Sequence, residues 1–73
     1  LNLYRLEFNM NPIVKYLALA MIAKMQNNTL RENMHLELAM MWAEDLSTDE
    51  IMVYNDQAHK MVCNLVELKH ASA

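Results

Sequence analysis

The chain has 73 residues, 55% of them hydrophobic, with a formal net charge of −3, no glycine and one cysteine. A chain this short forms one domain with a marginal core, and a single Cys63 excludes an internal disulfide. The acidic balance argues against nucleic acid as the main partner, because phosphate binding normally needs a basic surface. The longest apolar stretch, residues 13–25, is interrupted by lysines and too short to cross a bilayer, so we expect a soluble, cytoplasmic protein.

Residues 4–10 have the two-residue alternation of apolar and polar side chains that predicts a half-buried strand. No later segment of the chain alternates in this way, so the strand has no partner within one copy. The apolar members are Tyr4, Leu6, Phe8 and Met10, and the polar members are Arg5, Glu7 and Asn9.

Three helices are predicted after the strand, over residues 12–27, 30–45 and 48–70. Without glycine and with only one proline, the sequence favours long helices joined by short loops. The predicted fold class is therefore all-α, a single three-helix domain over residues 1–73 with a short N-terminal strand.

The predicted helix starts follow from residues that can satisfy free backbone amides in a first helical turn. Asn11 precedes the only proline and marks the first start. Thr29 with Glu32, and Ser47 with Glu50, have the spacing of capping boxes and mark the other two starts.

The distribution of apolar residues predicts self-association. The helix over 12–27 is apolar around most of its circumference, and the helix over 30–45 has two apolar faces. Because a monomeric three-helix bundle buries about one stripe per helix, we expect a homodimer or higher even oligomer, with the strands paired across a two-fold axis. Met34 and Met41, at helical spacing, are expected in the core of each copy. The predicted dimer contacts are Tyr4, Leu6, Phe8, Leu17, Met21, Leu36, Met40 and Ala43.

A strand followed by an Asn-Pro break and two helices resembles, in outline, the ribbon-helix-helix family of DNA-binding proteins. The resemblance covers about residues 3–46 and implies that Arg5 and Asn9 contact base edges. Glu7 on the same strand face, a missing glycine between the helices and the third helix depart from that family. Because of these departures, a dimeric DNA-binding regulator is the alternative function rather than the main prediction.

Residues that can bind a metal ion lie in one sector of the third predicted helix; they are Met52, His59, Cys63 and His70. Thiol and imidazole suit zinc or copper(I), but one helix cannot surround an ion. A full site needs ligands from another helix or chain, such as His35. We therefore predict no metal and no cofactor from this pattern alone, and leave metal binding open.

No glycine-rich phosphate loop and no suggestive set of serine, histidine and aspartate residues is present, so we expect no enzymatic activity. The predicted function is a protein–protein interaction module, such as an intracellular regulator, inhibitor or adaptor of the kind that bacteria and phages encode in short genes. Its expected partners are a second copy and another protein, with nucleic acid as the second candidate and no membrane. The residues predicted to bind a partner protein are Glu37, Glu44, Asp45, Asp49, His59, Cys63 and His70.

Overall fold

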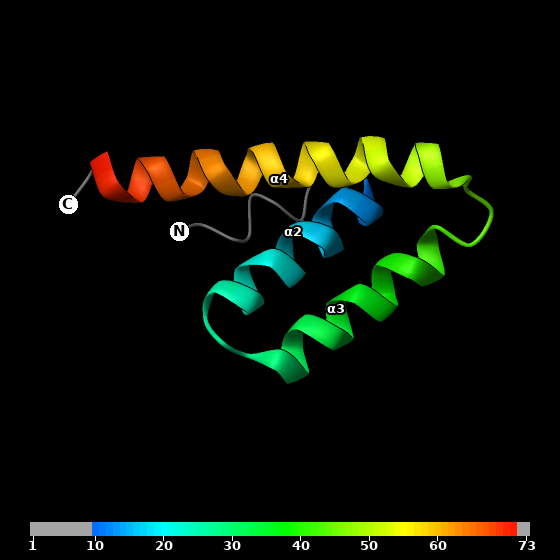
Figure 1. The fold of residues 1–73 in the computed structure, drawn as a ribbon, viewed down its shortest axis with the longest axis horizontal. Helices are drawn as coiled ribbons and strands as arrows, with labels where there is room; N and C mark the ends of the chain where they lie inside the picture. The colour runs from blue at the N-terminus through cyan, green and yellow to red at the C-terminus, as the bar shows by residue number, and fades with distance from the viewer. Residues whose placement is uncertain (1–9, 72–73) are drawn as a thin grey trace.

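The computed structural model describes residues 10–71, with side chains to residue 68. It contains three helices, α2 (Pro12–Met25), α3 (Thr29–Trp42) and α4 (Thr48–Ala71), shown in Figure 1. Between residues 10 and 71 there is no strand. The predicted three-helix, all-α architecture is confirmed.

The predicted strand over residues 4–10 lies outside the described residues except at its last position. Met10 lies in a bend, is half-buried and packs against the core. The pairing of two strands across a two-fold axis therefore stays a prediction.

Two of the three helix starts are capped as the sequence predicts. At the start of α2, the Oδ1 atom of Asn11 accepts a hydrogen bond of 2.8 Å from the backbone N–H of Ile13. At the start of α4, the backbone N–H of Glu50 donates to Ser47 Oγ at 3.2 Å, and that of Ser47 donates to Glu50 Oε1 at 3.3 Å. This reciprocal pair is a capping box.

The end of α2 has a Schellman motif, in which an asparagine replaces the usual glycine. Asn27 has a φ of 57°, in the left-handed region that asparagine tolerates better than most residues. Its backbone N–H donates to the carbonyl of Lys24 at 3.0 Å, and the N–H of Asn28 donates to that of Ala23 at 2.9 Å. The helix therefore ends at Met25, two residues before the predicted end.

The predicted capping box of Thr29 with Glu32 is wrong. Asn28 caps α3 instead, since its Oδ1 atom accepts a hydrogen bond of 3.1 Å from the backbone N–H of Arg31. Asparagine is a better N-cap than threonine, so the helix starts one residue earlier than predicted.

The connection between α3 and α4 is longer than predicted. α3 ends at Trp42 rather than at residue 45, and residues 43–45 form a turn. Leu46 and Ile51, half-buried on either side of the α4 cap, both pack against the core as a hydrophobic staple predicts.

We predict that Ser47→Ala lowers the free energy of unfolding by about 1 kcal/mol, because the substitution leaves the first-turn N–H of Glu50 without its acceptor. The matched control is Thr29→Ala, at the position where the sequence suggested a cap and the structure has none. Its expected cost is within about 0.5 kcal/mol. Urea denaturation followed by circular dichroism measures both, and equal losses would contradict the assignment of the caps.

The three helices form an open arrangement rather than a closed bundle. α2 packs against both α3 and α4, whereas α3 and α4 make no comparable contact with each other within the described chain. Figure 1 shows α2 between the other two helices, with α3 running opposite to both. The side of α3 that faces away from α2 is therefore left without a neighbouring helix.

The core is built largely from alanine. Ala39 of α3 and Ala43 at its C-cap are 1% and 3% exposed, and Ala58 of α4 is 0% exposed. Small side chains let helices approach closely, but they bury little apolar area per residue. The buried hydrophobic residues are Ile13, Val14, Leu17, Ala18, Ala20, Ala23, Ala39, Ala43, Ala58 and Val62.

Candidate docking surface on helix α3

Most of the large apolar side chains of α3 face solvent. On one side of the helix, Leu30 is 74%, Met41 71% and Trp42 60% exposed. Because this many exposed large apolar residues on one helix are unusual in a monomer, they mark a candidate interaction site. We define the α3 surface as the six exposed apolar side chains of this helix: Leu30, Met34, Leu36, Met40, Met41 and Trp42.

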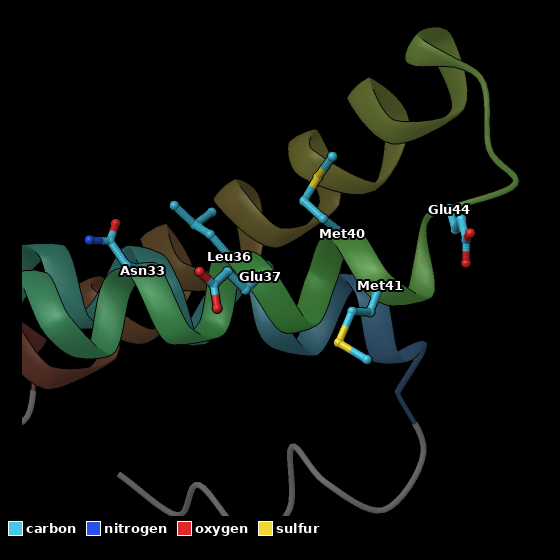
Figure 2. A pocket seen from close by; sticks show the side chains of 6 residues that line it. All are labelled: Asn33, Leu36, Glu37, Met40, Met41 and Glu44. Carbon is cyan, nitrogen blue, oxygen red and sulfur yellow. The ribbon is translucent and has the colours of Figure 1, made fainter.

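A polar stripe divides the α3 surface. Figure 2 shows Leu36 and Met40 pointing to one side of the helix and Met41 to the other, with Glu37 between them. Together with neighbouring polar residues they line an open depression of about 780 Å³, a shape suited to a side chain of a partner rather than to an enclosed small molecule. Its lining residues are Asn33, Leu36, Glu37, Met40, Met41 and Glu44.

The structure separates the predicted dimer contacts into three groups. Leu36 and Met40 are exposed, at 38% and 56%, and belong to the α3 surface. Leu17 and Ala43 are buried in the core of a single chain, while Met21 is half-buried. The predicted contacts on the strand lie outside the described residues; these are Tyr4, Leu6 and Phe8.

Part of the α3 surface was wrongly predicted to face the core. Met34 and Met41 were expected in the core, but they are 51% and 71% exposed. The reason is that α3 turns its alanine face, with Ala39 and Ala43, toward α2. Leu30 was likewise not predicted as a contact, and Ala39 with Ala43, one turn apart, is the signal that would have found it.

All four acidic residues predicted to bind a partner are exposed. Glu37 of α3 and Glu44 of the following turn line the depression. Asp45 lies in the same turn, and Asp49 in the first turn of α4, where a carboxylate favours the helix dipole. Glu37 belongs to the polar stripe that divides the α3 surface, the other three follow α3 in the chain, and their binding to a basic partner stays a prediction.

Of the candidate metal ligands on α4, the structure places two close together. His59 and Cys63 are both exposed, and the Nδ1 atom of His59 lies 3.7 Å from Cys63 Sγ. Only the backbone of His70, in the last turn of α4, is described, and the predicted DNA contacts Arg5 and Asn9 lie outside the described residues. Among the described residues, no group of three or more histidine, cysteine, aspartate and glutamate side chains is placed to hold a metal ion.

A second polar cluster joins α2 to α3. The ring of His35 stacks on that of Tyr16, with centroids 6.3 Å apart, and the Nζ atom of Lys15 lies 4.8 Å from the Tyr16 centroid. The Nδ1 atom of His35 is buried without a hydrogen-bond partner in the described structure. Partial burial, and then the positive charge of Arg31, lower the pKa of His35 below its ordinary value of 6.5. The ring of His35 thus packs against Tyr16, and among the described residues it is not part of a group of three or more such side chains placed to hold a metal ion.

This lowered pKa predicts that acid destabilises the fold. As the pH falls below 6.5, the unfolded chain protonates His35 before the folded chain does, so the free energy of unfolding decreases until the pH passes the folded pKa. The variant His35→Phe keeps a ring against Tyr16 and removes this titration. We expect wild type to lose more stability than His35→Phe between pH 7.5 and pH 5.5 in urea denaturation. Equal losses in the two proteins would contradict the assignment.

No helix within the described part of the chain is both long enough and apolar enough to cross a membrane. Comparison with protein-family models, with curated proteins and with solved structures finds no match.

Proposed function

We propose that this protein is a non-enzymatic interaction module that works as a homodimer, with the α3 surfaces of two copies packed against each other. One observation carries the proposal: a helix of 14 residues exposes six large apolar side chains, at 38% to 74%, while its one alanine, Ala39, is buried in the core. Apolar surface of this kind is stabilised by about 25 cal/mol per Å² when it is removed from water.

The composition of the core also favours a second copy as the occupant. No large side chain is fully buried in the described chain, so one copy has little hydrophobic stabilisation of its own. A two-fold axis beside α3 places the same apolar stripe on both copies, which makes the interface self-complementary. Asp45 and Asp49, which follow α3 in the chain, then lie at the rim, where charged residues remain hydrated.

The test is the oligomeric state of the double variant Met34→Glu/Met41→Glu. Two carboxylates per copy within the α3 surface repel their symmetry mates, so we expect wild type to sediment as a dimer and the variant as a helical monomer. The matched control is Met52→Glu/Leu68→Glu, which adds the same charge at exposed apolar positions of α4, at 59% and 66%.

The control should remain dimeric at every concentration at which wild type is dimeric. A wild-type protein that sediments as a folded monomer at about 100 μM would overturn the proposal. So would a control that dissociates as readily as the α3 variant, since the interface would then not lie on α3.

A further inference from the structure

A cavity separate from the α3 surface is lined by residues with soft donor atoms from two helices. It has a volume of about 610 Å³ and lies between the second half of α2 and the middle of α4, which are neighbours in Figure 1. It shares no residue with the α3 surface. Its walls are formed by Met21, Lys24 and Met25 of α2 and by His59, Val62, Cys63, Val66 and Glu67 of α4.

The spacing of His59 and Cys63 matches that of two ligands of one ion. Their Nδ1 and Sγ atoms are 3.7 Å apart, one helical turn from each other on the wall of the cavity. Donors bound at about 2.3 Å through sulfur and about 2.0 Å through nitrogen lie about 3.5–3.7 Å apart at tetrahedral to trigonal angles. The pair can therefore bind an ion with little rearrangement of either side chain.

α2 offers the further ligands that α4 alone cannot provide. Met21 and Met25 lie one turn apart on α2 and line the same cavity, so a thioether is available as a further ligand from the other wall. A set of thiolate, imidazole and thioether is soft, and soft sulfur ligands select copper(I) over harder cations. Zinc instead favours four-coordinate sites of thiolate, imidazole and carboxylate. Glu67 also lines the cavity, but no three such side chains among the described residues are placed to hold an ion.

We propose that this cavity binds one copper(I) ion through Cys63 Sγ, His59 Nδ1 and a thioether of Met21 or Met25. Binding replaces the thiol proton by the metal, so that one Cu⁺ is taken up and one H⁺ is released for each chain, with no change of oxidation state. Lys24 and Glu67 line the same cavity and offer one charge of each sign beside the neutral copper–thiolate unit.

The experiment is an anaerobic titration of the purified, ascorbate-reduced protein with copper(I), in competition with a chromophoric copper(I) chelator. We expect one ion per chain. Loss of a metal-site neighbour that is not itself a ligand already costs 10- to 100-fold in affinity, so Cys63→Ser should weaken binding by more than about 100-fold. His59→Ala and the double variant Met21→Leu/Met25→Leu should each weaken it by about 10-fold or more.

The matched control is Met52→Leu, which replaces a methionine of α4 that is 59% exposed and does not line the cavity. It should bind as wild type does, and circular dichroism should show every variant helical. Undiminished affinity in Cys63→Ser or in the double methionine variant would overturn the site, and so would zinc binding as tight as copper binding. The dimer variant Met34→Glu/Met41→Glu should keep full copper affinity, so this proposal and the proposed function can fail separately.

Discussion

Replacing Ala58 by leucine should lower the free energy of unfolding by about 1–3 kcal/mol or more, the cost of forcing extra methylene groups into a packed core. Ala58 is 0% exposed and belongs to the cluster that joins α4 to α2. A larger side chain there must push the two helices apart, and a small domain at the low end of the usual 5–15 kcal/mol range has little stability to lose. Urea denaturation followed by circular dichroism measures the effect.

The control for this substitution is Val53→Leu on the same helix, where the side chain is 55% exposed and an added methylene meets only solvent. Its expected effect is within about 0.5 kcal/mol. If Ala58→Leu were as stable as wild type, α2 and α4 would not be packed closely at this point, and the alanine core would need another explanation.

The helices could be predicted from the sequence because their signals are local. The box of Ser47 with Glu50 and the cap at Asn11 depend only on residues within one turn, and both are confirmed. The error at Thr29 was also local, since Asn28 next to it is the stronger cap. The end of α2 could not be predicted in this way, because Asn27 has the left-handed backbone conformation that glycine usually adopts.

The rotation of α3 could not be predicted from the spacing of its large apolar residues. Met34 and Met41 have the period of a core stripe, but a stripe that faces a second molecule has the same period as one that faces the core. Ala39 and Ala43 decide the orientation, because they allow close approach to α2. The alanines therefore set the orientation of α3, and its larger apolar residues are left exposed to solvent.

The candidate sites depend on this tertiary arrangement to different extents. Leu36 and Met40 were assigned from sequence to a contact surface, and their exposure agrees with that role. His59 and Cys63 were recognised as potential ligands on one helix, but only the packing of α2 beside α4 brings Met21 and Met25 to the same cavity. A pattern within one helix cannot show which donors a neighbouring helix provides.

Leu17→Ala should lower the free energy of unfolding by about 2–5 kcal/mol even in a monomer, the usual cost of truncating a buried leucine. Leu17 is 7% exposed within one chain, although its sequence context predicted a dimer contact. The substitution is best made in the monomeric background of Met34→Glu/Met41→Glu, since folding is there independent of association. Unfolding in urea, at two protein concentrations, gives the free energy and shows whether association still contributes.

Leu36→Ala in the same background gives the comparison, because Leu36 is 38% exposed and has lost its proposed partner surface. We expect it to cost less than about 1 kcal/mol there, but to weaken the dimer when placed in wild type. Comparing the two leucine substitutions thus distinguishes a core position from an interface position. If Leu17→Ala were silent in the monomer and harmful only in the dimer, Leu17 would belong to the interface, and the helix packing around α2 would differ from the one described.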